Sequence, residues 1–265
     1  MNKNNAMTLT FLGVGSAFTT AEYYQSNVLI RSTTGKNMLI DCGSDARFSL
    51  HEWCMKHETP RVDIDAVYIT HLHADHIGGL EWLAFSTYFN PHAIKPKLYA
   101  VDVLHEKIWK NALRSGLEYI SDRVMTISDY FDLQILSPDT PFLWENIQFT
   151  PLRMLHVLNS VHPIYSFGLI IQDLSSDKSF LFTSDTIFDT GLTDILETWA
   201  PKVRYIFQDC ETLPFHTEVH AHYNDLRTLP DAVKNKIWLY HYNPRPLQDP
   251  TADGFMGFVT KGDSF

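Results

Sequence analysis

The sequence predicts an α/β fold in which two β-sheets carry helices on their outer sides. In the first half of the 265 residues, apolar runs rich in β-forming residues alternate with stretches at helical spacing. After Asp129 short β-like runs dominate, and helix and strand signals alternate again near the end. This order of elements is typical of two packed sheets covered by helices. No repeat, low-complexity tract or linker-like segment interrupts it, so we expect one domain spanning residues 1–265.

The individual elements follow from periodicity and from turn signals. In the first half we expect strands at 8–12, 26–32, 37–41, 65–70 and 97–101 and helices at 44–57, 76–88 and 103–115. Ser44 or Asp45 is suited to cap the first of these helices. After Asp129 we expect strands at 130–136, 145–153, 166–172, 179–183, 203–208 and 236–240 and helices at 191–199 and 224–234.

Composition excludes some classes of function. The formal net charge of −10 argues against a broad basic surface for nucleic acid. Three cysteines, Cys42, Cys54 and Cys210, are odd in number and form no Cys-x-x-Cys pair, so a reducing compartment is expected. The start, residues 1–7, lacks the apolar core of a signal peptide, and no apolar run approaches the ~20 residues of a membrane span. We therefore expect a soluble, cytoplasmic protein.

Four potential metal ligands fall within the six residues His71-Leu72-His73-Ala74-Asp75-His76. They follow an apolar, strand-like run at 65–70 and precede a turn into a helix. The motif therefore lies on a loop at the carboxyl end of a strand, where α/β enzymes tend to place their chemistry. Imidazole and carboxylate together suit zinc and its first-row neighbours. The alternative is a polar loop that happens to be rich in histidine. Three histidines and an aspartate within six residues disfavour this alternative.

This motif resembles the His-x-His-x-Asp-His signature of the metallo-β-lactamase superfamily. The chain is most similar to the RNase Z-like phosphodiesterase branch, over nearly its whole length from Thr8 to Phe255. The resemblance implies a four-layer αββα sandwich with two divalent metal ions, zinc or manganese, at the shared edge of the sheets. Three later positions that each follow a β-like run match the remaining ligands. By the resemblance, one ion is held by His71, His73 and His156, the other by Asp75, His76 and His241, and Asp185 bridges them.

Each of these later ligands has a plainer alternative. Asp185 could be a turn or N-cap residue, and His241 a strand-end histidine bonded to backbone. His162 is the rival of His156, but Pro163 makes its backbone extended and it lies further from the strand end.

The branch also implies a loop histidine that helps the leaving group depart, oriented by an acidic residue at a strand end. Asp209 ends the strand-like run at 206–209, and His220 stands about as far before His241 as the loop histidine does in the family. We therefore expect His220 to act as general acid with Asp209 orienting it. His222, in the same loop, is the rival for this role.

The resemblance implies a reaction in which a metal-held hydroxide attacks phosphorus. The segment at His156 lacks the Thr-Pro-Gly-His-Thr pattern of the lactamase, glyoxalase and lactonase branches, which favours a phosphodiester. The chain also lacks the long basic arm of tRNA-processing RNase Z, so stable tRNA binding is not expected. The best resemblance is to compact phosphodiesterases of cyclic mononucleotides, including the anti-Pycsar proteins, which act as homodimers. A tRNA 3′-processing nuclease, a lactone or thioester hydrolase, and a metal-binding protein without turnover are the alternatives.

Overall fold

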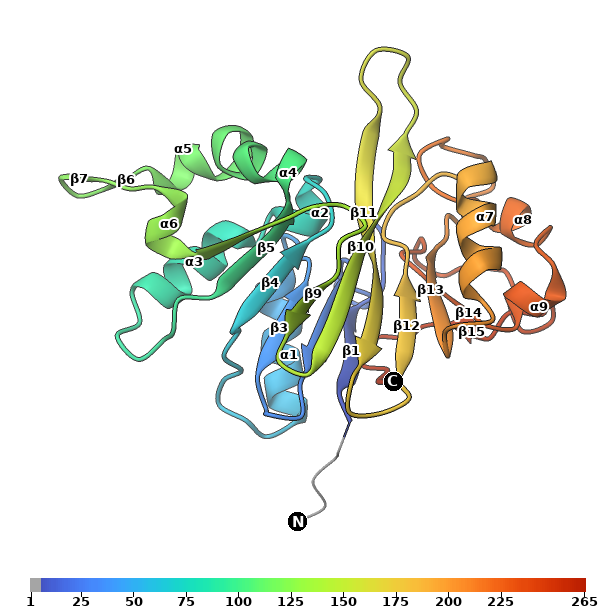
Figure 1. Ribbon diagram of the computed structural model, residues 1–265, viewed down its shortest axis with the longest axis horizontal. Coiled ribbons are helices and arrows are strands. Elements are labelled where there is room, and N and C mark those ends of the chain that lie inside the picture. Colours follow the sequence, from blue (N-terminus) through green and yellow to red (C-terminus); the bar gives the residue numbers. More distant parts are fainter. Residues whose placement is uncertain (1–5) are drawn as a thin grey trace.

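The computed structural model describes residues 6–265 and contains two stacked β-sheets with helices on both outer sides (Figure 1). The first sheet has the strand order β1 (Thr8–Gly13), β2 (Asn27–Arg31), β3 (Asn37–Ile40), β4 (Ala66–Ile69), β5 (Lys97–Val101) and β8 (Asp132–Leu136). The second has the order β15 (Gly257–Phe258), β14 (Ile237–Tyr240), β13 (Tyr205–Asp209), β12 (Ser179–Phe182), β11 (Ile164–Asp173), β10 (Ile147–Val157) and β9 (Phe142–Trp144). A small separate hairpin consists of β6 (Tyr119–Ile120) and β7 (Arg123–Val124). The expected αββα arrangement is confirmed.

Helices cover the outer sides of the two sheets (Figure 1). Those of the first half are α1 (Ala46–Lys56), α2 (Ala74–Ile77), α3 (Leu80–Tyr88), α4 (Asp102–Lys107), the π-helical turn η1 (Ile108–Leu113), α5 (Arg114–Leu117) and α6 (Ile127–Tyr130). Those of the second half are α7 (Thr190–Trp199), α8 (Tyr223–Leu226) and α9 (Asp231–Lys234). Within residues 6–265 the longest helix, α1, has 11 residues, and none could cross a membrane. The polar start at residues 1–5 lies outside the described residues.

Two expected helices are each split in the structure. The helix expected at 76–88 is divided into α2 and α3 at Gly78 and Gly79. A Cβ on Gly79 would overlap the carbonyl oxygen of Gly43, so the break lets the chain lie directly on the loop after β3. The helix expected at 224–234 is divided into α8 and α9 just before Pro230, which cannot continue a helix from the preceding turn. Periodicity alone predicted neither break.

The β10–β11 hairpin is longer than the strands expected at 145–153 and 166–172. The two strands pair in antiparallel register from Ile147 opposite Asp173 to Val157 opposite Ile164. Their upper parts pair with each other beyond the edge of the sheet, and the hairpin projects from the molecule (Figure 1). In β10 the added residues 154–157 are alternately buried and half-buried, but their sequence, Met-Leu-His-Val, does not alternate between apolar and polar residues. In β11 the added Ile164 and Tyr165 are exposed.

Aromatic side chains fill the space between the sheets. The ring of Phe11 on β1 lies 5.0 Å from that of Phe207 on β13 and 5.6 Å from that of Tyr240 on β14. Each fully buried aromatic side chain contributes ~1.5–3 kcal/mol to the free energy of unfolding. At the upper edge, the backbone N–H of Phe167 on β11 donates to the carbonyl of Thr70, directly after β4, at 2.9 Å. The carboxyl end of β4 in the first sheet therefore meets the amino end of β11 in the second, and the antiparallel β10 has its carboxyl end at the same edge.

Candidate metal centre

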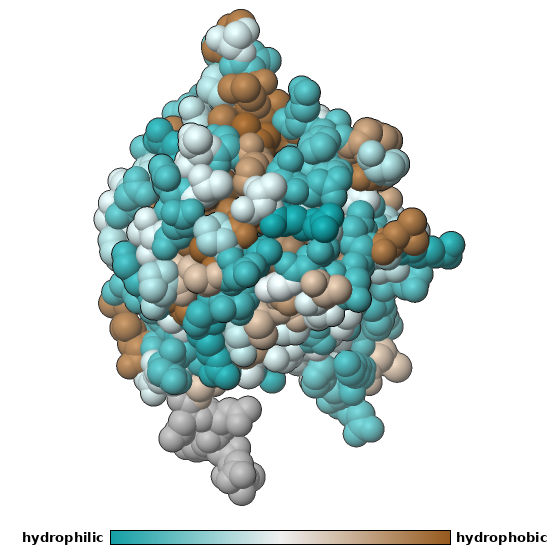
Figure 2. Space-filling view, turned by 90° about the vertical axis from the view of Figure 1, so that its right-hand side faces the viewer, coloured by the Kyte–Doolittle hydropathy of each residue, from teal (hydrophilic) through white to brown (hydrophobic). Residues whose placement is uncertain are grey.

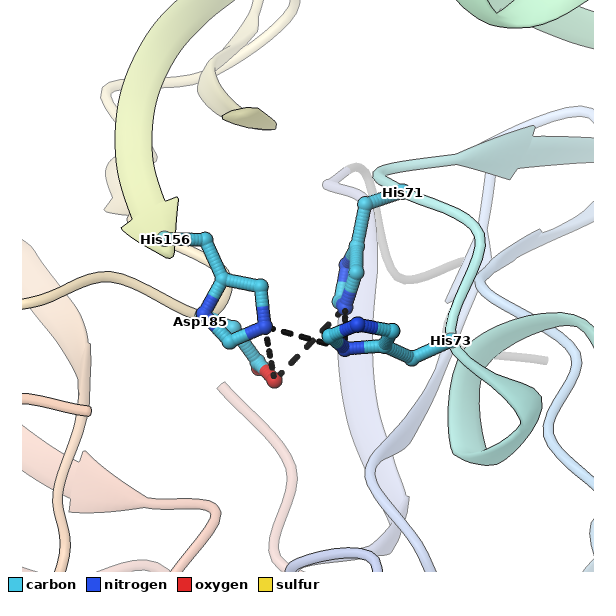
Figure 3. Close-up of side chains that lie close together, drawn as sticks. All are labelled: His71, His73, His156 and Asp185. Atoms are coloured by element: carbon cyan, nitrogen blue, oxygen red, sulfur yellow. Dashed lines mark hydrogen bonds and ion pairs between the residues drawn. The ribbon is translucent and has the colours of Figure 1, made fainter. Parts of the chain in front are cut away.

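Side chains from both sheets converge at this edge in a first group of His71, His73, His156 and Asp185 (Figure 3). His71 and His73 come from the loop after β4, whereas His156 comes from β10 and Asp185 from the loop after β12. Nδ1 of His73 lies 3.1 Å from Nε2 of His71 and 3.0 Å from Nε2 of His156. Oδ2 of Asp185 lies 3.7 Å from Nε2 of His71 and 3.8 Å from Nε2 of His156. Three imidazoles and a carboxylate thus point at one small volume.

A second group lies directly beside it and consists of Asp75, His76, His241 and Asp185. Oδ2 of Asp75 lies 3.3 Å from Nε2 of His76 and 3.3 Å from Nε2 of His241. Asp185 approaches the same two nitrogens: its Oδ2 lies 3.3 Å from Nε2 of His76, and its Oδ1 lies 3.5 Å from Nε2 of His241. Asp185 therefore belongs to both groups and is the one side chain that joins them.

The donor atoms of both groups suit divalent metal ions. Four of the five histidines direct Nε2 into the groups, and their Nδ1 atoms face other partners. Nδ1 of His71 lies 3.1 Å from Oγ1 of Thr70, and Nδ1 of His156 donates to the carbonyl of Val219 at 2.8 Å. Hydrogen bonds of this kind fix the orientation and tautomer of a metal-binding imidazole. Within the described residues, Nε2 of His76 and Oδ1 of Asp185 are buried without a hydrogen-bond partner, as expected of atoms that face a cation.

The two groups differ in charge. Burial lowers the pKa of His71 well below its usual value and that of His156 to about 4, so the first group presents neutral imidazoles. In the second group burial also acts to lower the pKa of His241, but the carboxylates of Asp185, Asp209 and Asp75 together outweigh it and the pKa rises to about 10. Protons there balance the carboxylates, and a divalent ion would replace those protons.

Asp41 supports both groups, and the sequence analysis did not single it out. It directly follows β3 and is buried, and Oδ2 accepts hydrogen bonds from Nδ1 of His76 at 2.7 Å and Oγ1 of Thr70 at 2.8 Å. Because Oγ1 of Thr70 donates to Asp41, it is left to accept from Nδ1 of His71. One carboxylate thereby orients an imidazole in each group. An acidic residue directly after an apolar strand is the signal that could have found it.

Several residues of the site hold left-handed backbone conformations. The φ angles are 62° at Asp41 after β3, 58° at Ser184 after β12 and 60° at His241 after β14. Such conformations cost non-glycine residues on the order of 1–3 kcal/mol and cluster at functional sites. Here they occur where three strands turn their last side chains toward the shared edge. Glycine is needed at position 43 because of close packing, since a Cβ there would overlap the carbonyl oxygen of Asp75.

His220 lies next to both groups. Nδ1 of His220 lies 3.0 Å from Oδ2 of Asp209 and 3.9 Å from Oδ2 of Asp185. Burial acts to lower the pKa of His220, but the carboxylate of Asp209 outweighs it, so the pKa lies above its usual value. The other oxygen of Asp209 lies 3.3 Å from Nδ1 of His241. Asp209 therefore faces both the loop histidine and a histidine of the second group.

The two rival histidines lie elsewhere. His162 is exposed in the turn of the β10–β11 hairpin and belongs to neither group of the described residues. His222 is buried, and both of its ring nitrogens have other partners. Nε2 donates to the carbonyl of Leu213 at 2.8 Å, while Nδ1 accepts from the backbone N–H of Asn224 at 3.2 Å and caps α8. His222 thus has a structural role in its loop.

A family model described as "Anti-Pycsar protein Apyc1" matches residues 7–265. The chain belongs to this family. The anti-Pycsar protein Apyc1 of Bacillus phage vB_BsuM-Goe3 is 36% identical over 263 residues, which cover 96% of both chains. That of Paenibacillus harenae is 35% identical over 254 residues, covering 96% of this chain and 97% of the relative.

Solved structures give the same fold. The metallo-β-lactamase fold protein YhfI from Bacillus subtilis superposes with a TM-score of 0.72 at 19% identity, covering 98% of both chains. A diphosphatase of the PhnP family superposes with a TM-score of 0.68 at 17% identity, covering 98% of this chain and 97% of that one. The metallo-β-lactamase fold is therefore confirmed. Together with the anti-Pycsar family and the two histidine–carboxylate groups, it identifies a metal-dependent hydrolase of the phosphodiesterase type.

Proposed function

We propose that the protein hydrolyses cyclic mononucleotides at a pair of divalent metal ions, zinc or manganese. The observation that carries this proposal is the pair of adjoining ligand groups that share Asp185, with His220 beside them. Two ions that share a carboxylate are typical of enzymes that cleave phosphate esters. Membership of the anti-Pycsar family supports the assignment to cyclic nucleotides.

The ligands in this proposal are those that the resemblance implied. His71, His73 and His156 would hold the first ion, Asp75, His76 and His241 would hold the second, and Asp185, which belongs to both groups, would serve both. When bound, the two ions supply an activated hydroxide and offset the charge of the phosphoryl group. The residues of the chain hold the ions in place through ring nitrogens whose opposite sides are already hydrogen-bonded.

His220 serves as the general acid in this proposal. Its Nδ1 faces Asp209 at 3.0 Å, which keeps the ring protonated and leaves the other ring nitrogen to donate to the departing oxygen. The leaving group of a cyclic nucleotide is a ribose alkoxide, which is a poor leaving group until it receives a proton. Asp209 is thus a positioning residue for the acid.

A small substrate is favoured over tRNA. The connection between β10 and β11 spans only residues 158–163, which leaves no room for a long basic arm. The net charge of −10 also opposes the binding of an extended polyanion.

We propose a homodimer as well, because the hairpin projects from the molecule with Leu158 and Val161 each 71% exposed (Figures 1 and 2).

Two further expectations belong to the proposal. One hydrophobic cluster contains side chains of both sheets, including Phe11 and Phe207, which supports a single domain over residues 1–265. Cys42, Cys54 and Cys210 are all buried as free thiols, which supports action in the reducing cytoplasm.

A substrate screen tests the proposal. The purified protein, supplied with zinc or manganese, is offered 2′,3′- and 3′,5′-cyclic mononucleotides, precursor tRNA, a lactone and a thioester. We expect fast hydrolysis of cyclic mononucleotides that a chelator abolishes. The proposal would be refuted if tRNA, the lactone or the thioester were turned over faster than any cyclic nucleotide. It would also be refuted if no substrate in the screen were turned over.

A further inference from the structure

A cavity of about 520 Å³ opens directly beside the first ligand group. His71 and His73 form part of its wall, α4 forms another part, and the β10–β11 hairpin closes a third side. Its volume lies within the ~300–1,000 Å³ that small-molecule sites occupy. A phosphate held at His71 and His73 would have the rest of its molecule within reach of this space.

The cavity has apolar walls. Leu72 follows His71, Leu104 projects from α4, and Phe167 and Tyr165 come from β11. Such surfaces are suited to the flat faces of an aromatic ring, and aromatic side chains commonly stack on nucleobases.

Two cations also line the cavity, Lys107 at the end of α4 and Arg153 on β10. Within the described residues neither side chain makes an ion pair or a hydrogen bond, although acidic residues outnumber basic ones by 31 to 21 over the chain. The guanidinium of Arg153 lies over the ring of Tyr165, 5.3 Å from its centroid. Both side chains are exposed on the wall of the cavity, so their donors are available to a ligand there.

We infer that this cavity is the subsite for the base of the substrate nucleotide, with Arg153 and Lys107 as specificity-determining residues. The inference rests on the proposed function and deepens it. Lysine and arginine side chains only donate hydrogen bonds, so they match carbonyl oxygens on a base. Uracil and guanine carry such oxygens, whereas adenine presents an amino group in their place. Uridine and guanosine cyclic nucleotides are thus favoured over the adenosine one.

The test replaces the two cations by methionine, which keeps the length of the side chain and removes its donors. In Arg153→Met and Lys107→Met, kcat/KM for uridine and guanosine 3′,5′-cyclic monophosphate falls roughly 10–100-fold, the range for losing a hydrogen bond from a charged group. The loss on the adenosine nucleotide is smaller. The loss on methyl p-nitrophenyl phosphate, a diester without a base, is smaller still.

Arg204→Met is the matched control. Arg204 is also exposed over a tyrosine, 5.4 Å from the ring centroid of Tyr205, but it precedes β13 and so lies at the opposite end of that strand from Asp209. It should leave all four rates unchanged. If Arg153→Met lowers kcat/KM equally on all four substrates, Arg153 contacts the phosphate or supports the fold and does not recognise the base. If the rates of this variant are unchanged, Arg153 takes no part in substrate recognition. Either result overturns the inference.

Binding separates this inference from the proposed function. The hydrolysis-resistant phosphorothioate analogue of uridine 3′,5′-cyclic monophosphate is titrated calorimetrically into each metal-loaded variant. We expect Arg153→Met to weaken binding by a factor similar to its loss in kcat/KM, even if the unmodified protein turns over no cyclic nucleotide. If Arg153→Met binds the analogue as tightly as the unmodified protein, the cavity does not hold the base.

Discussion

The ligand groups owe their order to hydrogen bonds on the far side of each ring. Asp41 is the most connected of these partners, since it accepts from His76 and Thr70, and Thr70 faces His71. Removing such a partner leaves the ligand in place but lets its ring rotate. The effect should therefore be seen in metal affinity before it is seen in the fold.

Asp41→Asn should weaken metal binding by roughly 10–100-fold, because Asp41 accepts hydrogen bonds at both oxygens, from the backbone N–H of Thr70 at Oδ1 and from Oγ1 of Thr70 and Nδ1 of His76 at Oδ2, whereas an amide has only one oxygen that accepts. Competition with a chromogenic chelator measures the affinity. Asp173→Asn is the control, because Asp173 is also buried, but at the far end of β11 and in contact with Met7 instead of the ligands. Equal affinities of Asp41→Asn and the unmodified protein would show that Asp41 does not orient His76.

His220→Ala should reduce the hydrolysis of a cyclic nucleotide by roughly 10²–10⁴-fold, because the ribose alkoxide must be protonated as it leaves. A p-nitrophenyl diester, whose leaving group departs without a proton, should lose much less. Both metal ions should remain bound. His222→Ala should have a smaller effect on the chemistry, since both ring nitrogens of His222 are bonded within its loop. Equal losses on both substrates would contradict the role of acid for His220.

Which residues the sequence reveals depends on how local their signal is. His71 to His76 stand within six residues, and the resemblance supplied the other three positions of the ligand set. Asp41 was missed because its partners come from another strand, 29 residues away at Thr70 and 35 at His76. No spacing in the sequence reports such a contact.

At the scale of elements, the β10–β11 hairpin carries several features of the site. It supplies His156 to the first ligand group and Arg153 and Tyr165 to the neighbouring cavity. Its tip extends beyond the sheet and exposes apolar side chains (Figure 2). Its strands were predicted too short, because residues 154–157 of β10 do not alternate between apolar and polar in the sequence, and Ile164 and Tyr165 at the start of β11 are exposed.

Leu158→Ser combined with Val161→Ser should weaken the proposed homodimer by roughly tenfold or more, because both side chains would lose their apolar contacts with the partner. Sedimentation velocity over a range of concentrations measures the dissociation. Leu174→Ser is the control, because Leu174 is 60% exposed at the opposite end of the same hairpin. A dimer as stable in the double variant as in the control would exclude the tip from the interface, and a monomeric unmodified protein would exclude the dimer.

At the scale of the whole molecule, the sequence predicted most strands and the two-sheet class, because buried strands carry a strong apolar signal. It could not predict from propensity that β4 and β11 meet at one edge, which depends on packing between sheets through residues such as Phe11 and Phe207. The four-layer αββα arrangement, with the metal site at the shared edge of the sheets, came from the resemblance. The breaks at Gly79 and Pro230 likewise reflect close approach and local geometry, not periodicity.

The most direct test of a two-metal phosphodiesterase is a titration of activity. Zinc or manganese is returned in measured equivalents per chain to protein stripped by a chelator, and hydrolysis of a 3′,5′-cyclic mononucleotide is followed. Activity should rise until two equivalents are bound and then remain level, and Asp185→Asn should stay inactive throughout, because both groups share that carboxylate. Full activity without metal, or no turnover with two ions bound, would contradict the account.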